Sequence, residues 1–534
     1  MRTSLAALSL GLTVICVTLS ATRIDAQDRP LPMVGHTSVF ALSPPVRDLA
    51  ASLSHAEIIL SRSTAERFQQ TASALSSNFA VGTTLLGLGN GFPNFGVSVT
   101  PPDANLAVGS TQIVQWANSE FAVFDKATGQ LQAGPLETSA LWASIGGQCM
   151  SGSTSSSELI VQWDRGHQRW LLSQNTMAQP PYYACIAVST SSDAMGSYYV
   201  YAFPQGSLLS ESPKWGVWSN GYYQTQGVFS NSGFVGPELC AYNSAKLIAG
   251  DEGAEQICFT LSPADGLPLP ADIDSNLAPP ANEDEFFISL WDSSHLSLYS
   301  LHPDYQNPQN STVTGNNGSQ LIAVPAFTPA CNGAYGGNCV PQKNSQSQLQ
   351  VLGDRLMFRL AYWEDTPEPV IRPIPPIRPP LQHWYVLHDS TAAGGNEAPR
   401  WYEFVAVVRA VPVTAISLAQ SGTFAPDANY RWMGSIARDK VRDVLLGYSE
   451  SSSGMYPSIA ITGRMQSDPL GTMENEVIVQ AGEGASFGSQ WGNFSSMRID
   501  PDGCTFWYTN EYYMAPPAQF WSTQIASARF SGCH

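Results

Sequence analysis

The chain has 534 residues, of which 43 % are hydrophobic, 10 % aromatic and only 13 % charged, with 44 Gly and 38 Pro. This composition excludes a coiled coil, a disordered chain and an all-helical fold, and it favours many short strands joined by loops. The formal charge is −18, because 43 acidic residues face 25 Lys and Arg. A nucleic-acid partner is therefore excluded, since such binders present a basic surface.

Residues 1–26 have the pattern of an export signal peptide. Arg2 precedes an apolar run from Leu5 to Leu19, and the small residues Ala21 and Ala26 follow it. The run is too short to span a membrane, and no later segment approaches the roughly 20 apolar residues that a span requires. We expect a protein secreted to the extracellular or periplasmic space, without a membrane span.

Residues 27–82 differ in composition from the rest of the chain. The stretch from Arg47 to Ser76 contains no Gly or Pro, and its apolar residues recur at roughly helical spacing. We predict a helical N-terminal extension or pro-segment here, separable from the fold that follows.

Residues 83–534 contain a weak repeat of short apolar segments, each preceded by a polar loop with Pro or Gly. The seven segments are Ala104–Val108, Glu158–Trp163, Trp215–Trp218, Phe286–Trp291, Arg355–Trp363, Trp432–Ala437 and Phe494–Ile499. Tight turns such as Asn220-Gly221 and Asp502-Gly503 supply the positive φ that two-residue hairpins need. Each unit has room for four strands, which predicts an all-β, seven-bladed β-propeller. A pair of β-sandwiches is the alternative.

The last repeat has room for only three strands. We expect residues shortly before Asp103, such as Gly96–Val99, to supply the fourth strand and close the ring. The proline-rich stretch Asp365–Gln382 is expected to be a surface insertion between two strands of one blade.

Eight cysteines lie outside the export signal. An even number in an exported protein indicates disulfides, and no CxxC motif supports a metal site instead. Eight cysteines allow 105 pairings, but pairing neighbours keeps each bridge within one local unit. The expected bridges are Cys149–Cys185, Cys240–Cys258, Cys331–Cys339 and Cys504–Cys533.

The segment from Asp500 to Trp507, DPDGCTFW, resembles the Asp box of sialidase-like propellers, with Asp502, Gly503, Thr505 and Trp507 at the matching positions. A looser match runs from Ser191 to Tyr198. In that family the box is a folding device and not a catalytic site. The segments PPDANLAVG, RWMGSIARD and WGNFSSMRIDPDGCTFWYTNEYY are also similar to secreted bacterial β-propeller proteins of unassigned activity. These resemblances imply a fold and leave the function open.

The loops that lead into the innermost strands of a propeller converge on one face around the central channel. The residues predicted there are Asp103, Lys214, Trp215, Glu283, Asp354, Arg355, Arg431, Trp432, Trp491 and Asn493. Carboxylates, fixed cations and aromatic rings together suit a sugar or another polar ligand. The alternative is that these charges form salt bridges between blades.

The sequence therefore predicts recognition of a polar extracellular ligand, foremost a glycan, by a monomer. A glycoside hydrolase or lyase acting on an acidic glycan and a protein-binding scaffold are the alternatives, because propellers host all three. Two of the carboxylates could act as acid and base in hydrolysis, but the sequence identifies no catalytic residues. The Gly484–Gly488 string matches G-x-S-x-G but has no helix after it. We expect no cofactor. Asn282–Glu285 could help to hold calcium, but the sequence favours a solvated acidic loop there.

Overall fold

The computed structural model describes residues 30–53, 77–97, 99–151, 158–333, 337–365, 381–407, 416–516 and 520–534. The predicted signal peptide, most of the predicted helix and most of the proline-rich insertion lie outside these residues. Among the described residues, no helix has both the length and the hydropathy to cross a membrane.

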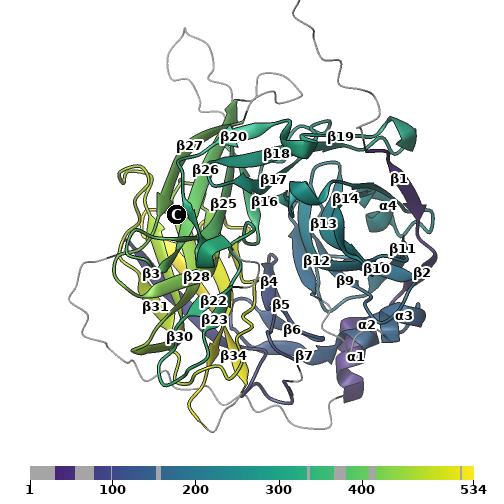
Figure 1. The fold of residues 1–534 in the computed structure, drawn as a ribbon. Coiled ribbons are helices and arrows are strands. Elements are labelled where there is room, and N and C mark those ends of the chain that lie inside the picture. The colour runs from purple at the N-terminus through teal and green to yellow at the C-terminus, as the bar shows by residue number, and fades with distance from the viewer. Residues whose placement is uncertain are drawn as a thin grey trace, which may run out of the picture.

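The described chain is almost entirely β-structure, arranged as successive antiparallel sheets (Figure 1). The first three sheets are formed by β4 (Asn105–Val108), β5 (Gln112–Ala117), β6 (Glu120–Asp125) and β7 (Leu131–Glu137); by β8 (Ile160–Asp164), β9 (Arg169–Asn175), β10 (Tyr182–Ser189) and β11 (Tyr198–Gly206); and by β12 (Leu209–Trp218), β13 (Gly221–Ser230), β14 (Gly233–Tyr242) and β15 (Glu255–Thr260). In each sheet every strand pairs with the next strand in sequence, as in the blades of a propeller.

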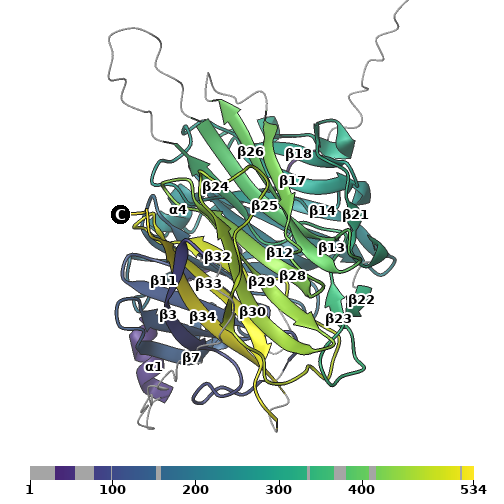
Figure 2. The same ribbon diagram turned by 90° about the vertical axis from the view of Figure 1, so that its left-hand side faces the viewer.

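Four further units follow. They are formed by β16 (Leu269–Ile273), β17 (Glu285–Asp292), β18 (His295–His302), β19 (Thr312–Thr314) and β20 (Leu321–Ala323); by β24 (Leu360–Glu364), β25 (Leu381–Thr391), β26 (Glu397–Val407) and β27 (Ser417–Thr423); by β28 (Tyr430–Arg438), β29 (Val444–Ser452), β30 (Met455–Arg464) and β31 (Val477–Gln480); and by β32 (Ser496–Ile499), β33 (Thr505–Tyr513) and β34 (Trp521–Phe530) with β3 (Phe79–Gly87). Smaller elements are β21 (Thr328–Pro329), β22 (Gly337–Val340), β23 (Leu349–Val351), α2 (Thr138–Trp142), α3 (Gly147–Ser151) and α4 (Ser244–Ala249). Figure 2 shows the later units side by side.

The first strand of each unit lies on the inside. Each inner strand contacts the next in the order β4, β8, β12, β16, β24, β28 and β32, and β32 contacts β4, so the ring is closed. The fold is therefore a β-propeller. Because β16 pairs in parallel with β24, two units share one continuous sheet. The count of seven blades remains a prediction, which this arrangement supports.

The inner strand of the fourth unit differs from the sequence prediction. The segment Phe286–Trp291 belongs to β17, the second strand, whereas β16 is innermost. Sequence hydrophobicity favoured the wrong strand because β16 contains Pro270 and the buried Asp272, which make it look like a loop.

The ring closes on an N-terminal strand, as expected, but a different one. β3 pairs with β34 along Phe79–Gly87, whereas Gly96 and Val97 lie outside the strands. A boundary at residue 83 would therefore cut through a strand of the closing unit.

The segment before β3 also belongs to the sheets. β1 (Met33–His36) pairs with β15, and β2 (Val39–Leu42) pairs with β11, so each becomes the outer strand of a neighbouring unit. Among the described residues before β3, the helix is α1 (Val46–Leu53). Residues 33–36 and 39–42 are therefore strands and not the predicted helix. That the extension can be separated from the fold stays a prediction.

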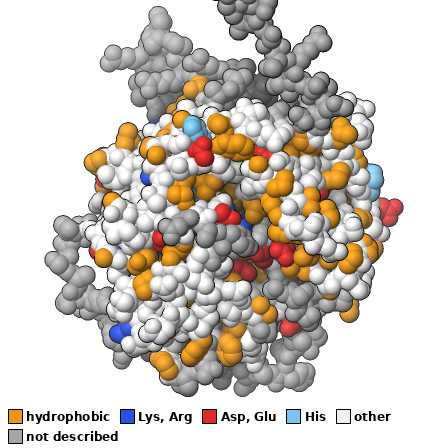
Figure 3. Space-filling view, viewed as in Figure 1, with side chains coloured by type: hydrophobic (Ala, Val, Ile, Leu, Met, Phe, Trp, Pro, Cys, Tyr) orange, Lys and Arg blue, Asp and Glu red, His pale blue; other side chains and the backbone are white. Residues whose placement is uncertain are grey.

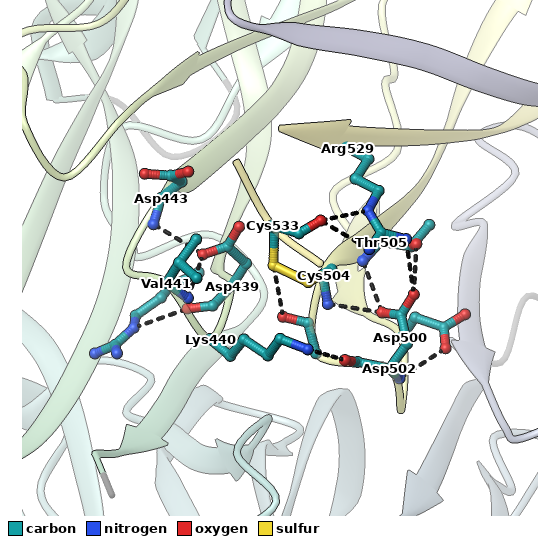
Figure 4. Close-up of a disulfide and its surroundings, with 12 residues drawn as sticks. Asp439, Lys440, Val441, Asp443, Asp500, Asp502, Cys504, Thr505, Arg529 and Cys533 are labelled. Carbon is teal, nitrogen blue, oxygen red and sulfur yellow. Dashed lines mark hydrogen bonds and ion pairs between the residues drawn. A yellow bond between two sulfur atoms is a disulfide. The ribbon is translucent and has the colours of Figure 1, made fainter. Parts of the chain in front are cut away.

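All four predicted disulfides are present: Cys149–Cys185, Cys240–Cys258, Cys331–Cys339 and Cys504–Cys533. Four disulfides are typical of proteins that fold in an oxidising compartment. The Cys504–Cys533 bridge lies beside the turn between β32 and β33 (Figure 4). Asp502 fixes this turn by accepting hydrogen bonds from the backbone N–H groups of Cys504 and Thr505, at 2.6 and 2.8 Å.

Candidate ligand-binding site on the channel face

We use the term channel face for the face of the ring on which the inner strands begin. Lys214 of β12 lies there, only 5 % exposed. Its Nζ donates to Asn493 Oδ1 at 3.0 Å and lies 3.0 Å from the centre of the Phe494 ring. Burial lowers the pKa of Lys214 to about 7, against the attraction of Glu158 and Asp103.

Asp103 and Glu158, which precede β4 and β8, act on this lysine, and Glu511 of β33 interacts with Asp103. Burial, with a contribution from the charge of Glu158, raises the pKa of Asp103 to about 8, and burial also raises the pKa of Glu158. Glu511 is 1 % exposed and accepts a hydrogen bond from the N–H of Gly492 at 2.6 Å. One oxygen of each carboxyl group has no hydrogen-bond partner within the described part of the chain. We call Asp103, Glu158, Lys214, Asn493 and Glu511 the axial cluster.

A β-bulge connects this cluster to a cavity. The pairing of β12 with β13 shifts register between Glu211 and Lys214, and Ser212 has φ of +55°. Ser212 Oγ donates to Glu158 Oε1 at 3.2 Å, and Ser212 also lines the cavity wall. Bulges and positive φ at a non-glycine residue concentrate at functional sites.

The cavity has a volume of about 440 Å³. One wall is aromatic: Phe229 and Phe234 lie 5.3 Å apart between ring centres, and Phe234 is 36 % exposed. Charged groups form another wall, where Arg355 binds both oxygens of Asp354 at 3.0 and 3.2 Å and Glu211 also lines the space. On the face of the molecule that Figure 3 shows, acidic side chains gather near the middle, with apolar side chains around them.

The structure brings together four of the residues predicted for this face. Asp103, Lys214 and Asn493 lie in the axial cluster, and Arg355 acts electrostatically on both Lys214 and Glu158. Asp354 lies at the cavity through its pairing with Arg355.

The three predicted tryptophans have a different role. Trp215 stacks on Tyr242 with 5.1 Å between ring centres, and Trp432 packs on Trp491 at 5.3 Å. All three are at most 1 % exposed, so they belong to the core and present no surface for a ligand.

Arg431 is completely buried in a network of its own. Its guanidinium binds Asp427 Oδ1 at 2.8 Å, Glu450 Oε1 at 3.0 Å and Glu476 Oε2 at 2.8 Å. These three carboxylates are close enough together to hold a metal ion, but the guanidinium already supplies a cation to all of them. Arg431 is therefore neutralised within its own unit, by ion pairs that join strands of one sheet and not the salt bridges between blades that were the alternative.

Glu283 lies near the other face. Its Oε2 accepts from Gln382 Nε2 at 2.6 Å, and its carbonyl oxygen accepts from Trp218 Nε1 at 3.2 Å. Glu283 was predicted on the channel face because it precedes a segment that was taken for an inner strand. That segment is β17, the second strand of its unit, which runs antiparallel to the inner strand β16 and therefore begins at the opposite face. Glu283 and Glu285 are both buried, so Asn282–Glu285 is not the solvated acidic loop that the sequence favoured over a calcium site.

The site also contains four residues that were not predicted from the sequence: Glu158, Glu211, Phe234 and Glu511. Glu158 begins one of the predicted inner segments, so its position before β8 was a usable signal. Glu511 lies within β33, and Phe234 follows a hairpin; only the packing of neighbouring sheets places them here.

A second buried charge network lies along the middle of the inner strands. Arg359 is 1 % exposed and binds Asp272 and Asp274 at 2.7 Å each. Arg498 also binds Asp272 and donates to the carbonyl of Leu106 at 3.1 Å. Burial alone would raise the pKa of Asp272, but Arg359 and Arg498 hold it below its usual range.

No protein-family model and no curated protein matches the chain. Among solved structures, it is similar to the WD40 domain of SCAP from fission yeast at 9 % identity and a TM-score of 0.33, covering 80 % of this chain and 82 % of that one. A thermostable family-43 glycoside hydrolase matches at 10 % identity and a TM-score of 0.28, with 71 % and 91 % covered. An exo-β-1,3-galactanase from Phanerochaete chrysosporium matches at 10 % identity and a TM-score of 0.27, with 85 % and 97 % covered. Scores this low assign no function, and the propeller architecture rests on the sheet order of this chain itself.

Proposed function

We propose that this protein is an exported propeller that binds a carbohydrate in the cavity beside Arg355. The observation that carries the proposal is the pairing of an aromatic wall, Phe229 and Phe234, with the polar wall of Asp354, Arg355 and Glu211. Aromatic rings pack against the apolar face of a sugar ring, while carboxylates accept hydrogen bonds from its hydroxyl groups and a guanidinium donates to them.

The charges favour a neutral sugar over an acidic one. Arg355 is already paired with Asp354, and Lys214 lies among carboxyl groups. Glu211 and Asp354 add negative charge to the cavity wall. An anionic sugar would therefore meet as much repulsion as attraction.

A glycan array followed by calorimetry on the best ligand tests this proposal. Phe234→Ala and Asp354→Asn should each weaken binding by about five- to tenfold, the scale of one aromatic contact or one hydrogen bond to a charged group. Phe487→Ala is the matched control, because Phe487 is 72 % exposed and does not line the cavity. Equal loss in all three variants, or an array without any bound glycan, would refute the site.

Hydrolysis of the bound glycan is the second candidate function. Ser212 links the cavity wall to Glu158, and the neighbouring Asp103 keeps a proton near neutral pH. Acid–base cleavage of a glycosidic bond requires one protonated and one ionised carboxyl group. Asp103 would be the acid, and Glu158, whose charged form Lys214 and Arg355 favour against burial, would be the base. An assay for new reducing ends decides: Asp103→Asn should abolish turnover and leave binding intact, whereas wild-type protein that releases nothing from its bound glycan is a binding protein only.

The remaining sequence predictions become part of the proposal. We propose that residues 1–26 are removed on export, which the four disulfides support, and that the mature protein is a monomer of seven blades. The likeness of the Asp502 turn to an Asp box also stays a proposal; it is supported by the hydrogen bonds that Asp502 accepts. Amino-terminal sequencing and light scattering of the secreted protein test the first two points.

A further inference from the structure

A second cavity, of about 360 Å³, lies at the opposite ends of the inner strands. Its walls come from the last residues of β8, β12 and β16 and the loops that follow them, including Arg165, His167, Trp218 and Asn276. The first cavity, in contrast, is lined near the beginning of β12, so the two cavities belong to different faces of the ring.

His167 is held in one orientation at this cavity. Its Nδ1 lies 2.8 Å from Asp164 Oδ2, and its backbone N–H donates to Asp164 Oδ1 at 3.0 Å. Asp164 is 2 % exposed and also accepts from Tyr222 Oη at 2.7 Å. Because Nδ1 is engaged with Asp164 and the side chain is 49 % exposed, the protonated ring has its Nε2–H left to donate to a ligand.

Arg165 supplies a cation to the same space. Its guanidinium donates to Asn276 Oδ1 at 3.1 Å and to the carbonyl of Ile499, both of them neutral acceptors. Within the described chain no carboxylate forms an ion pair with it; Asp274, Asp500 and Asp502 attract it only from longer range, and Arg359 repels it. A half-buried guanidinium without a paired anion is a site that an oxyanion can complete.

The rest of the wall is largely apolar. Trp218, Ile273 and Pro279 line it, and the hydroxyl groups of Ser219 and Ser275 are turned to backbone carbonyls. The cavity thus has a cationic end and an apolar end, which fits an amphiphilic small molecule.

We propose that this cavity binds a small organic anion, whose carboxylate or phosphate lies between Arg165 and His167 while its apolar part packs against the apolar wall at Ile273 and Ala278. The two possible anionic groups share this chemistry, and the probes distinguish them. The site is independent of the sugar cavity and needs no contribution from it.

Binding should weaken as the pH rises. The hydrogen bond and the charge of Asp164 raise the pKa of His167, against burial and the charge of Arg169. The imidazolium is therefore present below this raised pKa, and its attraction for an anion is lost as the pH rises through it.

The test is calorimetry of the full chain with phenylacetate, phenyl phosphate, inorganic phosphate and the neutral analogue phenylacetamide, at pH 6 and pH 8. At least one of the two aromatic anions should bind, more tightly at pH 6 than at pH 8, and the tighter of them identifies the anionic group. Arg165→Gln should weaken that binding about tenfold or more, the scale of a charge-assisted hydrogen bond. His167→Gln should weaken it less and remove the pH dependence.

Arg529→Gln is the control, because Arg529 is an exposed arginine outside the cavity, and it should change nothing. Thermal melting of each variant separates lost binding from lost folding, and His167→Gln keeps the test valid if Arg165→Gln fails to fold. Failure of both aromatic anions to bind, equal binding of phenylacetamide, equal binding of inorganic phosphate, or unchanged affinity in His167→Gln would overturn the proposal.

Discussion

Two buried groups of charges lie along the inner strands, and they differ in how completely they are hydrogen-bonded. Arg359 makes five hydrogen bonds, to Asp272, Asp274 and the carbonyl of Met497. In the axial cluster, in contrast, Asp103, Glu158 and Glu511 each keep a buried oxygen without a partner in the described chain.

The difference indicates which group is structural and which can act on a ligand. A buried charge that is paired and fully hydrogen-bonded holds elements together, and it has nothing left to offer a ligand. Buried carboxyl groups with unused oxygens and raised pKa values cost stability, and such groups concentrate at functional sites. The two groups should therefore respond to mutation in opposite ways.

The largest effect is expected for Arg359→Ala. Removing the guanidinium leaves Asp272 and Asp274 buried with far less compensation, which should lower the free energy of unfolding by about 3–5 kcal/mol. Arg47→Ala, which removes an exposed ion pair with Asp193, should cost only about 0–1 kcal/mol. Urea unfolding of both variants measures this, and equal small losses would show that the Arg359 network is not structural.

Arg431→Ala should have the next largest effect. Two of its carboxylate partners, Asp427 and Glu476, reach solvent, so the loss should be about 2–3 kcal/mol. Sugar affinity per folded molecule should not change, because Arg431 lies in its own network. A loss of affinity at unchanged stability would mean that Arg431 belongs to the ligand site and is not a structural residue.

Glu158→Gln should change stability by less than about 1 kcal/mol. Burial already disfavours the charged form of Glu158, and only Ser212 bonds to its side chain among the described residues. The free energy of unfolding in urea at pH 7 measures this. A loss as large as that of Arg359→Ala would mean that the axial cluster is structural as well.

The last expected effect is a change in the pH dependence of stability. The pKa of Asp103 is about 8 in the folded protein and near 4 in the unfolded chain, so the folded state binds the extra proton in between. The stabilisation that this proton gives to the folded state is complete below the pKa of the unfolded chain, and it is lost as the pH rises towards 8. Between pH 5 and 7, below the pKa of Lys214, wild-type stability should therefore fall with pH relative to Asp103→Asn. Parallel curves for the two proteins would show that Asp103 ionises normally.

A large part of the fold was predictable because it depends on local signals. Glycine-containing turns, apolar segments after polar loops and an even number of cysteines predicted the repeat, most inner strands and all four disulfides. The prediction failed where a strand has little hydrophobic character of its own, as in β16, or pairs with residues far away in sequence, as β1, β2 and β3 do.

Local signals in the sequence specify that this chain forms successive small sheets, and they show which residues stand before the inner strands, since hydrophobic spacing and turn chemistry act over a few residues. The role of each of those residues depends on its neighbours in the tertiary structure. Lys214 and Arg431 stand at similar positions in their units, yet one lies among carboxyl groups with unused oxygens and the other is neutralised by three carboxylates. The groups around Lys214 come from other units of the ring, whereas those around Arg431 come from its own unit, so the charge at each position depends on which segments the fold brings next to it.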